Sequence, residues 1–343
     1  MSLMEARVSW EAVTLQLRNP FRVSYGVSAT RRAFLLRLAN DEGWGEGTIP
    51  PYYGIGDEEI TAVFQKTSQS KNPFPDDPSN ISDWVGDEGV APARCALDMA
   101  LHDRIGRLRG LPLYQLLNLP KPVRMPTSFT ISLDTPEAMA EMARQIPHYP
   151  IIKVKLGGDD DVACIAAIRA ARPDVKLRVD ANAAWSPAEA IQRIKALIPY
   201  DLEMVEQPTP TADIDGMGEV QAHVDVPIVA DESVQTLDNV EQLAAAGVQG
   251  INLKLMKVGG IAPGLQMLHR ARELGMRVML GCMVETSLGV TAVSHLTALA
   301  DWIDLDAPLL IANDPFIGVQ YDEQNNLYLP SRPGIGVVRR EEE

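Results

Sequence analysis

The sequence is short of cysteine, of long apolar runs and of basic residues, and each shortage excludes a class of protein. Its 343 residues include three cysteines, Cys95, Cys164 and Cys282, which lie far apart and form no C-x-x-C pair. A disulfide framework and a structural zinc site are therefore not expected, and a reducing compartment, the cytoplasm, is favoured. No apolar run is long enough to span a membrane, and the N-terminus shows no signal-peptide pattern.

The shortage of basic residues gives the chain a net charge of −15, because 46 acidic residues oppose 31 basic ones. Nucleic acid and anionic membranes repel such a chain, so neither is expected as a partner. With 46% hydrophobic and 22% charged residues, the composition is that of an ordinary globular protein. The length predicts two domains, or one large barrel with an addition.

The first 124 residues have mixed patterns. Residues 7–17 and 31–40 read as strands, and the glycine-rich run 41–47 reads as a turn. Residues 57–69 and 91–109 read as helices. Three prolines at 119–126 disfavour both a helix and a central strand, which indicates a linker at the end of this region.

Beyond the linker, short β-rich runs alternate regularly with helical stretches. Eight strands are predicted, at 127–132, 151–156, 176–182, 202–208, 227–233, 250–256, 277–283 and 302–306. The helical stretches carry start signals, with Thr135 before Pro136 in one and the capping box of Ser186 and Glu189 in another. Eight strands alternating with seven helices predict a parallel (β/α) barrel of the TIM type.

The ends of most predicted strands carry a charged residue. Six of these strand-end residues are charged and one is a cysteine: Lys155, Asp180, Glu206, Asp231, Lys254, Cys282 and Asp304. They are spaced by 25, 26, 25, 23, 28 and 22 residues, about one strand–helix unit each. In such barrels the carboxyl ends of the strands carry the active site, so these side chains are expected to meet there.

The three acids end consecutive strands, which makes them neighbours. Asp180, Glu206 and Asp231 would repel one another unless a cation lay between them. Oxygen ligands held by a rigid barrel suit one Mg²⁺ ion that keeps positions open for water and substrate. Each acid alone could equally be a helix cap or a loop residue, but three in register on adjacent strands favour a metal site.

The lysines of the run IIKVKLGG, residues 151–158, predict acid/base chemistry. Lys153 and Lys155 are two apart in a strand and therefore share a face. Lys254 ends the sixth strand, opposite the second, so Lys155 and Lys254 would face each other across the metal. Nearby cations lower the pKa of a lysine, and Lys153 is expected to lower that of Lys155 in this way. On its own, the K-V-K pattern would equally suit a solvated edge strand.

Two bases on opposite sides of one carbon can remove a proton from one side and return it to the other. This geometry predicts a racemase or epimerase. A proton next to a carboxylate is a very weak acid, and its removal leaves an enediolate with two negative charges. A metal ion bound to the carboxylate stabilises that charge, which gives the predicted metal and lysines one shared reaction.

The motifs KVKLGG, VDANAAW, VEQP, ADES and KLMKVGG together resemble the muconate-lactonizing branch of the enolase superfamily over nearly the whole chain. The resemblance implies a modified (β/α)₇β barrel with an N-terminal α+β capping domain. It places the cap at residues 1–124, the barrel at 125–308 and a tail that returns to the cap at 309–343. It also implies that Asp180, Glu206 and Asp231 bind Mg²⁺ and that Lys155 and Lys254 are the acid/base pair.

The eighth strand indicates which members of the branch the chain is similar to. Asp304 and Asp306 share a face at its end, where they would bind a cationic group such as an α-ammonium. The dipeptide epimerases of the branch have such an Asp-x-Asp, and the resemblance implies inversion of the C-terminal residue of a dipeptide, with L-Ala-D/L-Glu as one candidate. The acids could instead merely cap the last loop.

Other functions stay open at this point. An N-succinylamino acid racemase or an o-succinylbenzoate synthase would use the same first step, and a cycloisomerase is a weaker alternative. Their substrates lack a free ammonium and leave the two acids of the eighth strand without a role. A catalytically silent barrel that serves in binding is disfavoured, because the acids and the lysines are all present. A homo-oligomer is compatible with the sequence, which specifies no symmetry.

Substrate selectivity is expected to come from two segments of the cap, residues 18–28 and 49–56. Their candidate contacts are Arg18, Arg22, Tyr25, Tyr52 and Tyr53, each of which could equally be a surface residue. An arginine there would suit an acidic side chain. In the barrel, Cys282 and Met283 end the seventh strand, where mandelate-racemase-like members use a histidine, and they are expected to contact the substrate. The five histidines all fall outside the strand ends.

Overall fold

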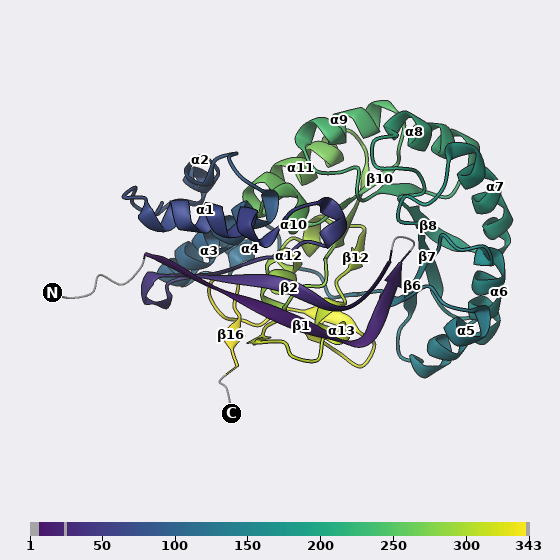
Figure 1. Cartoon of the computed structure of the whole chain (residues 1–343), viewed down its shortest axis with the longest axis horizontal. Coiled ribbons are helices and arrows are strands. Elements are labelled where there is room, and N and C mark those ends of the chain that lie inside the picture. Colours follow the sequence, from purple (N-terminus) through teal and green to yellow (C-terminus); the bar gives the residue numbers. More distant parts are fainter. Residues whose placement is uncertain (1–6, 24–25, 341–343) are drawn as a thin grey trace.

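The computed structural model describes residues 7–23 and 26–340 and shows a cap packed beside a barrel (Figure 1). The cap holds a three-stranded antiparallel sheet made of β1 (Val8–Val23), β2 (Gly26–Leu38) and β3 (Trp44–Gly47). Its helices are α1 (Asp57–Gln69), α2 (Ile81–Val85), α3 (Ala91–Arg109) and α4 (Leu113–Leu116). The predicted helices 57–69 and 91–109 are confirmed as α1 and α3.

Two predictions for the cap need correction. The expected turn at 41–47 contains strand β3, which pairs with β2 and packs against α3. A Cβ at Gly45 would lie 1.8 Å from the carbonyl oxygen of Ala96, so the glycines here allow close packing as well as turning. The expected loop at 18–28 is mostly the far end of the long β1–β2 hairpin, whose strands reach Val23 and resume at Gly26.

All eight predicted barrel strands are confirmed. They are β5 (Phe129–Ile131), β6 (Ile151–Lys155), β7 (Lys176–Asp180), β8 (Leu202–Glu206), β9 (Ile228–Ala230), β10 (Gly250–Leu253), β11 (Arg277–Gly281) and β12 (Trp302–Asp304). They pair in this order and in parallel.

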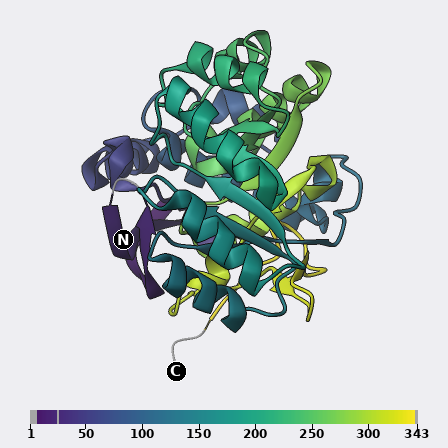
Figure 2. The ribbon, with the colours of Figure 1, turned by 90° about the vertical axis from the view of Figure 1, so that its right-hand side faces the viewer.

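The helices between the barrel strands form its outer layer (Figures 1 and 2). They are α5 (Pro136–Gln145), α6 (Asp161–Ala171), α7 (Pro187–Leu197), α8 (Ile214–His223), α9 (Leu237–Ala245), α10 (Leu255–Val258) with α11 (Ile261–Glu273), and α12 (Ser287–Ser294). Both predicted helix starts are confirmed. The Thr135 side chain accepts a hydrogen bond from Ala138 N, and Ser186 and Glu189 form the capping box.

Side chains close the barrel between its last and first strands. Within the described residues, no backbone ladder joins β12 to β5. Instead Ser128 Oγ donates to Asp304 at 2.5 Å, Thr130 N donates to Asp306 at 2.9 Å, and Leu305 N donates to Thr127 Oγ1 at 2.8 Å. The two acids of the eighth strand therefore hold the barrel together as well as ending that strand.

The C-terminal segment contacts both parts of the molecule. After α13 (Ala307–Leu310), strands β14 (Gln320–Tyr321) and β15 (Asn326–Tyr328) form a sheet with β4 (Met125–Pro126), and β13 (Phe316–Ile317) pairs with β16 (Val338–Arg339). Leu113 N of the cap donates to Gly334 O. The domain limits at 124 and 308 stay predictions.

The three cysteines are free thiols, as the sequence predicted, while the cytoplasmic location stays a prediction. No helix in the described part of the chain has both the length and the apolar character needed to cross a membrane.

Candidate active site

Three carboxylates meet at the carboxyl ends of β7, β8 and the segment after β9. Asp180, Glu206 and Asp231 are buried, and each offers a ligand atom within 4.8 Å of the other two. The strand register brings them together, since Asp180 pairs with Glu206 across β7 and β8. Three buried carboxylates with oxygen donors this close suit a divalent metal ion.

Four lysine ammonium groups surround these carboxylates. Lys155 Nζ lies 2.6 Å from Asp180 Oδ2, and Lys254 Nζ lies 2.7 Å from Asp231 Oδ2. The predicted acid/base pair thus stands at the two ends of the acidic trio. Both side chains are less than 8% exposed, which gives them little access to bulk water.

Lys153 has a different environment from Lys155, its neighbour on the same face of β6. Its ammonium group contacts three carboxylates, Asp180 at 3.1 Å, Glu206 at 2.7 Å and Asp304 at 2.8 Å. It therefore bridges the acidic trio and the end of the eighth strand. The repulsion expected between the two lysines is offset by these carboxylates.

Sequence reasoning assigned no role to Lys257. This buried lysine, in the quoted motif KLMKVGG, contacts Asp231 Oδ1 at 2.5 Å and Asn252 O at 3.1 Å. Its spacing of three from Lys254, one helical turn away, was the available signal.

Burial and neighbouring charges shift the pKa values of Asp180 and Glu206 in opposite directions. Burial alone would raise the pKa of Asp180, but Lys155 and Lys153 outweigh it and lower the pKa to about 2. Burial and the charge of Asp180 raise the pKa of Glu206 to about 8. Like charges packed this closely oppose joint ionisation, which a metal cation would relieve.

The expectation of a lowered pKa is not met for Lys254. Burial acts to lower the pKa of Lys254, but the carboxylate of Asp231 outweighs it and raises the pKa well above the usual value. For Lys153, burial is likewise outweighed by Asp304 and Glu206. The protein's own carboxylates thus keep both ammonium groups charged, and a lowered pKa requires a cation that competes for those carboxylates.

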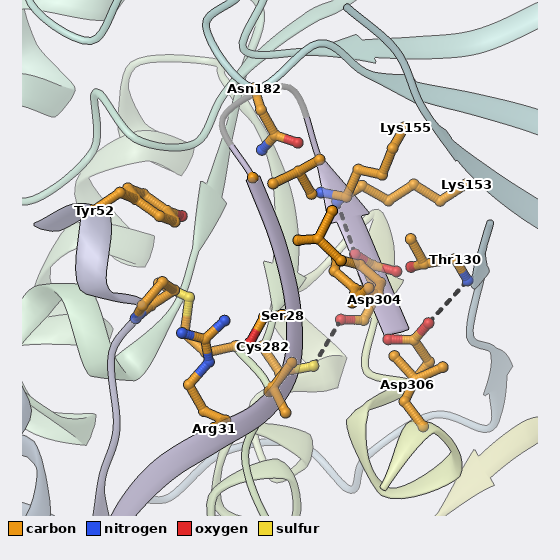
Figure 3. A pocket seen from close by; sticks show the side chains of 18 of the residues that line it. Ser28, Arg31, Tyr52, Thr130, Lys153, Lys155, Asn182, Cys282, Asp304 and Asp306 are labelled. Atoms are coloured by element: carbon orange, nitrogen blue, oxygen red, sulfur yellow. Dashed lines mark hydrogen bonds and ion pairs between the residues drawn. The ribbon is translucent and has the colours of Figure 1, made fainter. Parts of the chain in front are cut away.

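A cavity of about 320 Å³ opens above the acidic trio, between the cap and the barrel (Figure 3). The barrel contributes Thr130, Lys153, Lys155, Asn182, Lys254, Cys282, Met283, Asp304 and Asp306 among its lining residues, and the cap contributes Phe21, Ser28, Arg31 and Tyr52. Cys282 and Met283 therefore lie where the sequence placed them. None of the five histidines, all of them in the described part of the chain, lines this cavity.

The two acids of the eighth strand have unequal partners. Asp304 accepts hydrogen bonds from Lys153 Nζ at 2.8 Å and from Ser128 Oγ. Asp306 accepts a hydrogen bond from Thr130 N to Oδ2 and also interacts with the Thr130 side chain, and it forms no ion pair among the described residues. Burial and the charge of Asp304 raise the pKa of Asp306 to about 7. An incoming cation would favour the ionised form of Asp306.

The cap candidates are divided between two hollows. Tyr52 lines the main cavity, whereas Arg18 and Arg22 line a neighbouring hollow between the hairpin and α5, and both are exposed. Tyr53 lines neither of these two hollows, and Tyr25 lies outside the described residues.

Sequence reasoning missed several cavity residues in both parts of the molecule, among them Thr130 and Asn182 of the barrel and Arg31, Ser28 and Phe21 of the cap. The Phe21 ring centre lies 5.8 Å from Lys155 Nζ. Nothing in the local sequence pattern separates Arg31 from other arginines of a strand, because its place at the site depends on how the hairpin folds over the barrel.

This cap and barrel, with two lysines flanking three carboxylates that suit a divalent metal ion, define an enzyme of a known class. Residues 136–343 match the family described as "Enolase C-terminal domain-like". The chain belongs to the enolase superfamily, and the predicted class, a racemase or epimerase of that superfamily, is confirmed.

Among its relatives are several dipeptide epimerases. The chain is 38% identical to the L-Ala-D/L-Glu epimerase of Bacteroides thetaiotaomicron, over 95% of this chain and 86% of that protein. The crystal structure of the dipeptide epimerase from Enterococcus faecalis with Mg and L-Leu-L-Tyr has a TM-score of 0.90 at 31% identity, covering 96% of this chain and 98% of that one. The substrate-liganded L-Ala-D/L-Glu epimerase from Bacillus subtilis has a TM-score of 0.88 at 32% identity, with 97% and 98% covered.

Proposed function

We propose that the protein is a Mg²⁺-dependent dipeptide epimerase that inverts the α-carbon of the C-terminal residue. The observation that carries this proposal is a single cavity lined by Lys155, Lys254 and Asp306. Two proton carriers face a space that also holds a carboxylate fit for an ammonium group. A dipeptide offers both features that this arrangement calls for, an acidic α-hydrogen and a free N-terminus.

The acidic trio would hold the Mg²⁺ ion. Asp180, Glu206 and Asp231 offer hard oxygen ligands from adjacent strands, and the structure of the Enterococcus relative contains Mg. When bound, the ion supplies positive charge that stabilises the enediolate form of the substrate.

Lys155 and Lys254 would move the proton. They lie at opposite ends of the trio, so a substrate carbon between them presents one face to each. One neutral lysine takes the α-proton from its side, and the other, as an ammonium group, gives a proton from the opposite side.

The substrate ammonium group would bind Asp306 in preference to Asp304. Asp304 already neutralises Lys153, while Asp306 forms no ion pair with any of the described residues and its hydrogen bonds come from Thr130. We therefore assign Asp304 to holding Lys153 in place and Asp306 to direct contact with the N-terminus. Lys153, placed against Glu206 and Asp304, acts through its charge on the substrate carboxylate and on its neighbour Lys155.

The opposite side of the cavity would receive the side chain that is inverted. Figure 3 shows Thr130 and Asp306 on one side, and Tyr52 and Arg31 on the other. A substrate whose N-terminus binds Asp306 extends toward Arg31, whose guanidinium group complements an acidic side chain. An L-Ala-D/L-Glu substrate satisfies this polarity. Arg22, the earlier candidate, lies in the neighbouring hollow and stays a prediction.

A pooled exchange experiment tests the proposal. The protein is incubated in D₂O with Mg²⁺ and two libraries, L,L-dipeptides and N-acylamino acids, and α-deuterium is measured by mass. We expect exchange confined to dipeptides, strongest with an acidic C-terminal residue. Exchange confined to N-acylamino acids would instead support a racemase of that class, and exchange in neither library would overturn the proposal.

A further inference from the structure

A carboxylate of the cap is buried against the start of a barrel helix. Glu46, in β3, has no exposed surface. It accepts hydrogen bonds from Thr286 N at 2.9 Å, from Thr286 Oγ1 at 2.6 Å and from Gly289 N at 3.2 Å. These groups form the N-terminus of α12, where backbone N–H groups lack helical partners and favour negative charge. Glu46 thus links two segments 240 residues apart.

Both linked segments continue directly into walls of the cavity. On the cap side, Pro50, Pro51 and Tyr52 line the cavity four to six residues after Glu46. On the barrel side, residues 282–284 line it just before Thr286. The link therefore lies where the two walls come together.

A second carboxyl group supports the barrel side of this link. Glu285 is buried, and its Oε1 accepts a hydrogen bond from Met283 N at 2.9 Å. A Cβ at Gly289 would lie 2.0 Å from Glu285 Oε2, so this side chain fits closely over the first turn of α12. Burial and the nearby charge of Glu46 raise the pKa of Glu285 well above its usual range. A proton held on Glu285 lets the two carboxyl groups share this site without full repulsion.

We propose that Glu46 is a positioning residue that joins the two walls of the cavity, fixing the cap loop 50–52 against the barrel loop 282–285. It touches neither the acidic trio nor the two lysines, so it acts on how the substrate is held. The consequence for catalysis rests on the proposed function, while the structural link itself can be measured without any substrate.

Hydrogen exchange of the backbone amides measures the link directly. In Glu46→Ala we expect amide exchange at least tenfold faster in 282–289, since three donors of that segment lose their acceptor. We expect the same increase in 48–53, since the cap loop is then no longer held against the barrel. Glu46→Gln keeps one acceptor oxygen and should give a smaller increase in the same two segments. Because it is also the gentler change, it provides the measurement if Glu46→Ala does not fold. Unchanged exchange in either wall would overturn the proposal.

A matched control separates positioning from general loss of stability. Asp103, on α3, is also fully buried and accepts hydrogen bonds from Trp44 N at 3.0 Å and Ile335 N at 2.8 Å, but it contacts neither cavity wall. Asp103→Asn should lower the melting temperature, with faster exchange near 333–336 and little change at 282–289.

Kinetics then test the consequence for the substrate. For Glu46→Ala we expect the KM for a dipeptide to rise at least tenfold, while the Mg²⁺ concentration for half-maximal activity changes less than twofold. Glu46→Gln should recover part of the loss, and Asp103→Asn should stay within twofold of the wild type in KM. An equal rise in KM for Asp103→Asn and Glu46→Ala would reduce Glu46 to a structural residue. If the wild type turns over no dipeptide, the proposed function fails, whereas the exchange result still decides whether the link exists.

Discussion

Replacing Asp306 by asparagine isolates the charge that we assign to recognition of the substrate's N-terminus. Asparagine has the same shape, and its amide oxygen can still accept the hydrogen bond from Thr130 N that closes the barrel. The change therefore removes one negative charge from the cavity and leaves the seam between β5 and β12 in place.

The expected magnitude follows from the burial of the site. Asp306 is 4% exposed, so little water is available to replace the lost charge. A hydrogen bond to a charged group contributes about 1.5–3 kcal/mol, and losing one partner of a buried charge pair costs about 2–5 kcal/mol. A loss of about 2–3 kcal/mol corresponds to a rise in KM of about 30- to 150-fold. Because Asp306 does not contact the acidic trio, the Mg²⁺ requirement should change little.

The assay compares a dipeptide with its N-acetyl derivative, which has no ammonium group, in the wild type and in Asp306→Asn. The wild type should discriminate strongly against the derivative, and the variant should lose most of that discrimination. Asp304→Asn is the matched variant. It frees Lys153 beside Glu206, so it should also change the Mg²⁺ dependence. Equal effects of Asp306→Asn on both substrates would refute the assignment.

Three further outcomes are expected. Chelation of divalent ions should abolish α-exchange, and added Mg²⁺ should restore it. Mg²⁺ at 100 times its dissociation constant should add about 2.7 kcal/mol to the free energy of unfolding, which raises the melting temperature. An unchanged melting temperature would contradict a metal site at the acidic trio. Burial lowers the pKa of His295 to about 4 from 6.5. Its neutral form is therefore favoured by folding, and its contribution to stability is complete above pH 6.5 and falls by about 3 kcal/mol as the pH drops to 4; an NMR titration showing a pKa near 6.5 would refute this. Ser186→Ala removes the cap of α7 and should cost about 1 kcal/mol in denaturant unfolding, whereas no change would deny the capping box a role.

The barrel and its chemistry could be predicted from the sequence because both depend on local sequence patterns. Strands and helices alternate with a nearly constant spacing, and in such a barrel the strand ends meet at one face. Asp180, Glu206 and Asp231 were thus identifiable as neighbours, as were the lysines that flank them. The relative positions of these residues depend on strand register alone, and the regular spacing of the strands along the chain sets that register.

The cap's contribution to the site could not be predicted in the same way. Arg31 reaches the cavity, and Arg22 does not, because of how the β1–β2 hairpin lies over the barrel, and that placement depends on contacts between distant segments. The ion pair between Lys153 and Asp304 was likewise not predicted, since each residue was considered only with its neighbours in sequence. Glu46, within a run expected to be a turn, becomes buried through a strand pairing and a helix start far along the chain.

The central claim, proton transfer by two lysines on opposite sides of one carbon, is tested most directly by stereochemically resolved exchange. An L,L-dipeptide and its L,D-epimer are each incubated with Mg²⁺ in D₂O, with the wild type, Lys155→Ala and Lys254→Ala, and deuterium at the C-terminal α-carbon is followed by NMR. Both variants should lose epimerisation, and each should retain at most exchange of the one epimer whose proton faces the remaining lysine, with the two variants retaining opposite epimers. Near-native epimerisation by either variant, or exchange of the same epimer by both, would contradict the two-lysine mechanism.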